Sequence, residues 1–146
     1  MSGGAGARRC GRIAAVLAAA AAALGAGGCG LDVNLGDVFV LTRTEAGATL
    51  TLVVNQSGTL SCNGAAPKTI SSAMLIQARD LSVDLAADAT AKLTIPRSPG
   101  TVQYFRIVLQ QGTVAFPDRA AATHKTLAQA ELFATQAAQQ VCGLTG

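Results

Sequence analysis

The stretch Ala48–Asn55, ATLTLVVN, alternates aliphatic side chains with threonine or valine, and this period of two is the strongest constraint on the fold. Side chains of a β-strand point to opposite faces in turn, so the pattern predicts a half-buried strand. Residues 37–44 are rich in β-branched and aromatic side chains and predict another strand. Residues 45–47 fit a hairpin loop between the two, and Asn55–Gly58 favours a turn into a third strand at 59–63.

The hydrophobic period changes to three and four after residue 70. Ser71 or Ser72 can cap a helix there, and the spacing predicts an amphipathic helix of four or five turns. Its apolar positions are Met74, Leu75, Ala78, Leu81, Leu85 and Ala89. Asp80, Asp84 and Asp88 repeat on another face. Calcium loops need more closely spaced oxygen ligands and a turn glycine, so we interpret this row as a solvated face rather than a metal site.

A second β-hairpin is predicted from residues 101–110 and 113–116, with a turn at Gln111 and Gly112 and an end at Pro117. Alternation places Gln103, Phe105, Ile107 and Leu109 on one face of its first strand, opposite Val102, Tyr104, Arg106 and Val108. A second amphipathic helix follows, with Thr123 or Thr126 as its cap. Gly143 lies where helices often end.

In chain order these segments give β-β-β-α-β-β-α and predict an α+β fold. Strands joined by tight turns pair antiparallel. We therefore expect one antiparallel sheet of about five strands, with two amphipathic helices packed on one face. A single domain over residues 37–146 fits the length of the chain.

The first 28 residues predict a cleaved signal peptide. A basic segment with Arg8, Arg9 and Arg12 precedes the uninterrupted apolar stretch Ile13–Leu24, and small residues follow; this is the order of a secretory signal. The stretch is too short for a transmembrane helix, which needs about 20 apolar residues. The three arginines carry the whole net charge of +3. The neutral remainder gives no electrostatic reason to bind nucleic acid.

Cys29 follows the small residues LGAGG, and this segment resembles a bacterial lipobox. The resemblance implies that Cys29 is acylated and becomes the mature N-terminus, with residues 29–36 as a lipidated tether. Ala26 stands where the lipobox usually has leucine, and Leu24 lies two residues further back. Ala26 and Gly28 also suit the ordinary signal peptidase, so both kinds of cleavage stay open. The second would leave Cys29 free or paired with another chain.

The number of cysteines favours lipidation. Cys10 leaves with the signal peptide, and the exported part keeps Cys29, Cys62 and Cys142, an odd number that needs an explanation. Lipidation of Cys29 leaves one pair, and we expect Cys62 and Cys142 to form a disulfide in an oxidising compartment. That bond would tie the last helix to the third strand. A metal role is disfavoured because the single histidine, His124, cannot complete a zinc site with two cysteines.

The sequence carries no motif for catalysis. GxSxG and GxxxxGK[ST] are absent, and an aromatic content of 3% is too low for sugar-binding platforms. His124 is expected to cap a helix or to be exposed. Pro117, Asp118 and Arg119 could bind a partner, but they fit more simply a strand end that turns into a helix. We therefore predict no enzyme, no catalytic residues, no cofactor and no metal.

Several segments resemble small uncharacterised exported lipoproteins of high-GC Gram-positive bacteria; they are FVLTR, LTLVVN, RIVLQQGTVAFPD and AELFATQAAQQVCGL. The resemblance implies a cell-envelope protein held by a lipid at Cys29 on the extracytoplasmic side of the membrane. We expect a non-catalytic binding or structural module, with an unidentified envelope protein as its partner. The hairpin that ends in Phe116, Pro117 and Asp118 also resembles part of small inhibitors of thermolysin-like metalloproteases. That similarity implies an alternative, a protease inhibitor displayed at the surface.

Overall fold

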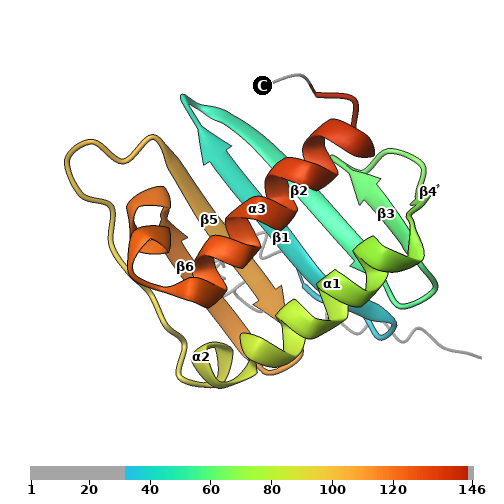
Figure 1. Cartoon of the computed structure of the whole chain (residues 1–146), viewed down its shortest axis with the longest axis horizontal. Coiled ribbons are helices and arrows are strands. Elements are labelled where there is room, and N and C mark those ends of the chain that lie inside the picture. Colours follow the sequence, from blue (N-terminus) through green and yellow to red (C-terminus); the bar gives the residue numbers. More distant parts are fainter. Residues whose placement is uncertain (1–31, 145–146) are drawn as a thin grey trace, which may run out of the picture.

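The computed structural model describes residues 32–144, which form one antiparallel sheet of six strands with helices on one side (Figure 1). The strand order is β4-β3-β2-β1-β5-β6. The strands are β1 (Asp37–Glu45), β2 (Ala48–Asn55), β3 (Thr59–Cys62), β4 (Lys68–Thr69), β5 (Gln103–Leu109) and β6 (Gly112–Pro117). The helices are α1 (Ser72–Asp84), α2 (Ala86–Thr90), the 3-10 helix η1 (Asp118–Ala122) and α3 (Lys125–Gln140). The predicted α+β fold is confirmed, and β4, α2 and η1 are short additions to it.

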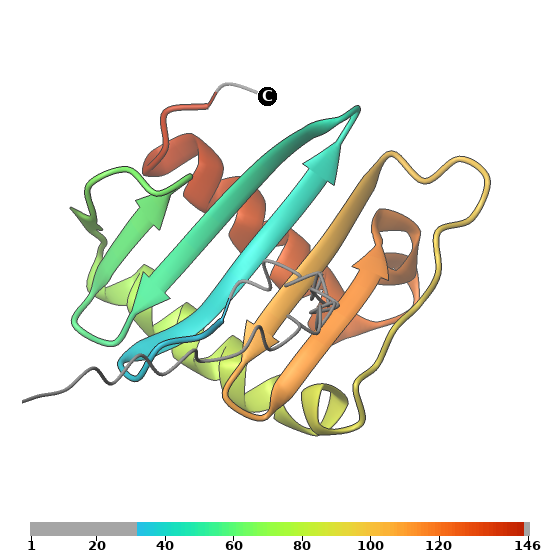
Figure 2. The ribbon, with the colours of Figure 1, turned by 180° about the vertical axis from the view of Figure 1, so that it is seen from behind.

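The fold has two layers. Figure 1 shows α1 and α3 lying across the same face of the sheet. Figure 2, from behind, shows that no helix of the described residues covers the opposite face. We call this second face the open face. The distinction decides which side chains of each strand enter the core and which remain available to a partner.

The first hairpin has the tight turn that the sequence predicts. β1 and β2 pair from Glu45 and Ala48 at the turn, in continuous register, to Phe39 and Val54. The two loop residues, Ala46 and Gly47, have positive φ angles of 46° and 82°. Such turns match the right-handed twist of the flanking strands, so the local sequence sets the register of the central pair.

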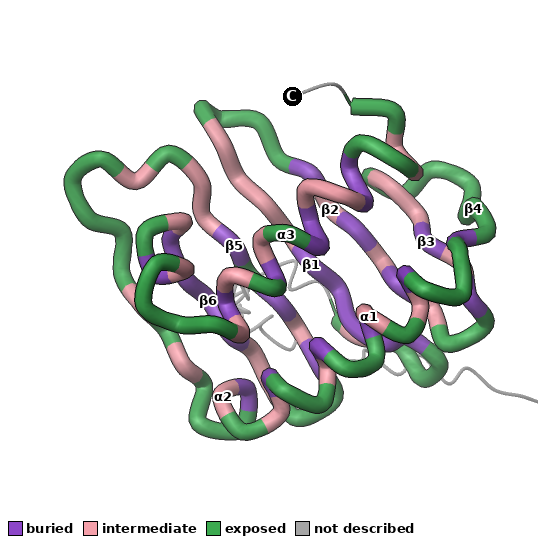
Figure 3. Tube along the Cα trace, viewed as in Figure 1, coloured by how far each residue is buried: buried purple, intermediate pink, exposed green. Residues whose placement is uncertain are grey.

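Alternation divides the strands between the two faces as predicted. The side chains that point toward the helices are almost all buried (Figure 3). On the central strands they are Phe39, Leu41, Leu50, Leu52, Val54, Phe105, Ile107 and Leu109. The side chains that point the other way are mixed, and all but Val40 are half-buried or exposed. On the central strands they are Val40, Thr42, Thr44, Thr49, Thr51, Val53, Tyr104, Arg106 and Val108. One exception is Arg43, a half-buried cation on the helix-facing side, between Leu50 and Phe105 in the register.

The helix layer contributes small side chains and the sheet contributes large ones. α3 buries four alanines together with Leu127 and Phe133. The ring of Phe133 meets that of Phe39 edge to face, with centroids 5.4 Å apart. Phe105 and Phe116 stack at 5.2 Å on neighbouring strands. Aromatic pairs of this kind add about 0.5–1.5 kcal/mol each beyond their buried area.

The helix predicted after residue 70 is divided in two. Ser71 is the N-cap, and its hydroxyl accepts a hydrogen bond from the amide of Met74 at 3.2 Å. The first helix ends at Asp84, and α2 begins after Leu85. Leu85 is fully buried, and its amide bonds back to Leu81. The prediction of one continuous helix was wrong, because the apolar spacing continues through the break without a glycine or proline to mark it.

The ends of α3 differ in how well the sequence predicts them. The helix begins at Lys125, with His124 in the N-cap position, so neither Thr123 nor Thr126 is the cap. The side chain of His124 makes no capping hydrogen bond. At the other end Gly143 has a φ of 70°, as expected for a residue just past a helix.

Both edges of the sheet are covered by short pieces of chain. β4 pairs with β3 through only Thr59–Thr69 and Leu60–Lys68. At the other edge the segment 93–95 lies beside β6, where Ala115 donates to the carbonyl of Leu93 and accepts from the amide of Ile95. Exposed strand edges are templates for unwanted pairing, and these two segments leave little edge available.

Replacing Gly112 with alanine is expected to destabilise the fold more than replacing Gly64. Both glycines have positive φ angles, 150° and 75°, so each alanine adds backbone strain of about 1–3 kcal/mol. A Cβ on Gly112 would also collide with the carbonyl oxygen of Ala89, whereas nothing lies within 4 Å of a Cβ on Gly64. We expect G112A to lose about 1–3 kcal/mol more than G64A in urea unfolding. Equal losses would contradict close packing of the β5–β6 turn against α2.

Candidate functional site

The predicted disulfide between Cys62 and Cys142 is present and joins two distant parts of the chain. The two residues are 80 positions apart in sequence, with Cα atoms 5.9 Å apart. Cys62 ends β3, and Cys142 follows α3. Beside the bond, the Lys68 ammonium donates to the carbonyl of Val141 at 2.8 Å. A covalent bond and a charge-assisted hydrogen bond therefore hold the end of α3 to the edge of the sheet.

Two shallow depressions adjoin this disulfide. Their volumes are about 220 and 300 Å³, and they share Leu50, Asn63 and Leu144. Arg43 and Glu45 line the second one. Small-molecule pockets usually enclose about 300–1,000 Å³, so both are at or below the lower end of that range. The lining of the first is mainly aliphatic and that of the second mixes aliphatic with polar and charged side chains. Their small size favours contact with a partner's side chain over enclosure of a small ligand.

A third depression, of about 260 Å³, lies between α1 and α3. Its lining includes Ile76, Asp80 and Asp84 from α1 and Gln129 from α3. Both aspartates are exposed and Asp88 is half-buried, as expected for a largely solvated row. Within residues 32–144, no group of three metal-ligating side chains is close enough to hold an ion.

Asp118 has a structural role in the segment that the sequence suggested as a partner site. Its carboxylate accepts hydrogen bonds from the amides of Val102 and Gln103, at 3.1 and 3.2 Å. The amide of Arg119 also donates to it, at 2.9 Å. Phe116 and Pro117, just before it, are buried. The simpler of the two sequence interpretations therefore describes this segment, a strand end that turns into a helix and fastens the loop before β5.

The same loop is held on the open face by Tyr104. The Tyr104 hydroxyl donates to the carbonyl of Ile95 at 3.1 Å. The guanidinium carbon of Arg97 lies 4.5 Å from the centroid of the Tyr104 ring, a distance at which cations are attracted to the ring face. These contacts place Arg97 on the same side of the sheet as the exposed Arg106.

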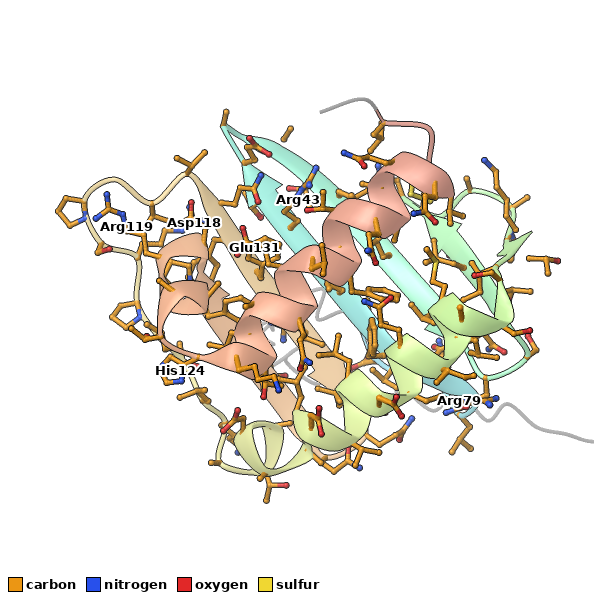
Figure 4. All side chains as sticks on the ribbon, viewed as in Figure 1. Arg43, Arg79, Asp118, Arg119, His124 and Glu131 are labelled. Carbon is orange, nitrogen blue, oxygen red and sulfur yellow. A yellow bond between two sulfur atoms is a disulfide. The ribbon has the colours of Figure 1, made fainter. Side chains whose placement is uncertain are left out.

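The surroundings of Glu131 raise the pKa of its carboxyl group. Burial raises its pKa above the ordinary value of 4.5, and the negative charge of Asp118 raises it further. Figure 4 places Glu131 on α3, facing the region of η1 where Asp118 lies. Two carboxylates that repel each other can share a proton in acid catalysis, but Asp118 is committed to three backbone amides. The pair therefore changes stability with pH rather than forming an obvious catalytic dyad.

The only histidine stands apart from these groups. His124 is exposed at the start of α3, away from Asp118 and Glu131 (Figure 4). It was expected to be exposed or capping, and its position is that of an N-cap without a side-chain hydrogen bond. This position gives it no nucleophile or carboxylate partner for a triad.

The open face carries hydroxyl groups in matched rows. Thr42 lies opposite Thr51, and Thr44 lies opposite Thr49. In the centre, buried Val40 lies between Val53 and Val108, which are half-buried. Arg106 lies opposite Thr42 on the next strand. Alternation made these residue types readable from the sequence, but only the structure establishes which face the helices cover.

The lipidation site predicted at Cys29 lies outside the described residues. Among residues 32–144, no helix is long and apolar enough to cross a membrane. Comparison with known proteins found no matching family model, no matching curated protein and no matching solved structure.

Loss of the disulfide is expected to destabilise the domain strongly. The C62S/C142S double variant removes a crosslink that closes a loop of about 80 residues, which corresponds to up to about 4–5 kcal/mol of stability in the loop-entropy account. K68M, which removes only the bond to Val141, should cost about 1 kcal/mol. Urea unfolding of both variants measures the difference. A double variant that loses no more than K68M would contradict a stabilising crosslink.

Glu131→Gln is expected to reduce the dependence of stability on pH. Because the folded pKa of Glu131 lies above its ordinary value of 4.5, the folded state binds this proton more tightly than the unfolded state does. Stability from this group is therefore full below about pH 4.5 and is lost as the pH rises through the raised folded pKa.

Urea unfolding at a series of pH values between 4 and 7 tests this effect. E131Q should show a smaller loss of stability across the range than the unsubstituted protein. D80N, which changes an exposed carboxylate on α1, serves as the control and should leave the slope unchanged. An E131Q slope equal to that of D80N would contradict the assignment.

Proposed function

We propose that this protein is an exported lipoprotein of the cell envelope, held on the extracytoplasmic side of the membrane by an acyl group on Cys29. Its folded domain acts as a binding or structural module without catalysis. Residues 1–28 serve as the signal peptide, and residues 29–36 join the anchor to the domain. The observation that carries this proposal is the Cys62–Cys142 disulfide, because it leaves Cys29 as the unpaired cysteine of the exported part.

The disulfide supports export because such bonds persist in oxidising compartments and are rare in the cytosol. It supports lipidation by elimination. Cys10 lies within the proposed signal peptide, and Cys62 is bonded to Cys142. Cys29 is then the remaining thiol, and it follows the small residues expected before an acylated cysteine. Diacylation supplies the two lipid chains that stable anchoring requires.

The described part of the tether is short and attached to the domain. The amide of Asn34 donates to the carboxylate of Asp37 at 3.1 Å, and its carbonyl accepts from the amide of Asp37 at 3.0 Å. The side chain of Gln110 also donates to the carbonyl of Asn34, at 3.1 Å. This arrangement suits a domain that stays close to its anchor rather than one that reaches across the envelope.

A binding role without catalysis is supported by how the polar groups are used. Asp118 is occupied by backbone amides, and His124 is exposed and distant from it. The depressions near the disulfide and between the helices are small and shallow. The alternative, a displayed protease inhibitor, has weaker support, because Phe116 and Pro117 of the segment that suggested it are buried.

The anchor is tested by producing the full chain in a bacterium that processes lipoproteins. We expect the mature protein in the membrane fraction, with mass spectrometry showing a diacylated Cys29 as its first residue. C29S should lose the acyl group and leave the membrane fraction on washing. C10S is the matched control and should remain acylated. An N-terminus at another residue, or an unmodified Cys29 in the native protein, would refute the anchor.

A further inference from the structure

The open face differs in charge from the helix layer. Its strand positions carry no free carboxylate, and its exposed cations are Arg106 on β5 and Arg97 in the loop that Tyr104 holds. The helices of the opposite layer carry five carboxylates and three cations, namely Asp80, Asp84, Asp88, Asp118 and Glu131 against Arg79, Arg119 and Lys125. The open face is therefore the more cationic of the two sides.

The chain enters the domain from the open side. Hydrogen bonds between Asn34 and Asp37 close a turn before β1. Within the sheet, β1 has β2 on one side and β5 on the other. The helices cover the face opposite the open face. The bond from Gln110 holds Asn34. Figure 2 shows the first described residues, in blue, in front of the start of β1 when the open face is viewed.

This entry point limits how far the domain can turn from its anchor. Asp32 is the first described residue, and Cys29 is three residues earlier. Three extended residues span about 10 Å. An acyl group on Cys29 would therefore hold Asp32, where the chain enters on the open side, within about that distance of the lipid headgroups.

We propose that the open face lies flat against the phospholipid headgroups of the membrane, with Arg106 and Arg97 directed at their phosphates. This inference rests on the proposed acylation of Cys29. The arginines match the anionic surface, and guanidinium groups pair well with phosphate oxygens. The threonine rows, Thr42–Thr51 and Thr44–Thr49, present hydroxyls to the hydrated interface. The acidic helix layer then faces away from the lipid, toward partners in the envelope.

A flat orientation differs measurably from an upright one. Thr49 is exposed on the open side at the far end of β2 from the tether, opposite Thr44. Ala87 is exposed on α2, which packs against the β5–β6 turn near the start of β1. If the domain stood upright on its tether, Ala87 would lie nearer to the lipid. If the open face lies on the lipid, Thr49 is nearer.

The test uses the acylated protein in vesicles of phosphatidylcholine and phosphatidylglycerol that contain lipids with spin-labelled headgroups. A fluorescent probe is attached at T49C or, as the matched site, at A87C. We expect at least threefold stronger quenching of the probe at position 49. R106E should reduce this ratio by at least half, and R106Q by less. K125E, which reverses a charge on the helix side, should leave it unchanged.

Each outcome bears on a different part of the argument. A ratio near one, a ratio that favours position 87, or a ratio that R106E leaves unchanged overturns the flat orientation. The acyl mass of the same preparation is measured in parallel. An unmodified Cys29 overturns both the anchor and the orientation, whereas an acylated protein with equal quenching overturns the orientation alone. Circular dichroism and an intact Cys62–Cys142 bond establish that each variant is folded.

Discussion

The close packing of α3 on the sheet is the contact on which the rest of the fold depends. α3 presents a face of alanines, and the sheet presents large aliphatic and phenyl side chains. Small residues on the helix leave room for the large side chains of the sheet, so few aromatic residues suffice to fill the core. Phe133 is the one large ring that α3 adds, and it meets Phe39 on the central strand. The positions of α1, η1 and the disulfide all follow from where α3 lies.

Two attachments fix the ends of this layered body. At the C-terminal end, the disulfide and the Lys68–Val141 hydrogen bond hold α3 to the short outer strands. At the other end of the helix, Asp118 binds the amides that precede β5, and η1 leads directly into α3. The helix is therefore held at both ends by groups that are distant in sequence.

Local patterns were enough to predict most of the architecture. The period of two located β2 at the same residues that the structure gives, and it placed Phe105 and Ile107 on one face of their strand, which the structure shows to be buried. The break at Leu85 escaped prediction because its apolar spacing continues into α2. β4 and the bridge between Thr94 and Ala115 also escaped, because each depends on a partner strand distant in sequence. Hydrophobic periodicity indicates which face of a helix or strand is apolar. It does not indicate the residue at which tertiary contacts make that helix or strand end.

The candidate site was predictable to a smaller extent. Counting cysteines predicted the Cys62–Cys142 bond correctly, because setting aside Cys10 and Cys29 leaves a single pair. The role of Asp118 was open in the sequence, since its three amide donors come partly from residues 15 and 16 positions away. The cationic character of the open face was also hidden. Arg97 joins Arg106 there only through the fold of a proline-containing loop over Tyr104.

If the acyl anchor proposed above holds the protein on a membrane, the covered edges of the sheet affect how neighbouring copies meet. β4 shields one side with two residue pairs, and residues 93–95 shield the other through Ala115. Molecules that diffuse in two dimensions meet repeatedly at their flanks and in similar orientations. Exposed edge strands would then pair with the edge strands of neighbouring copies and extend the sheet from one copy to the next. Because both edges of the sheet are covered, many copies can then occupy the same area of membrane without pairing through their strands.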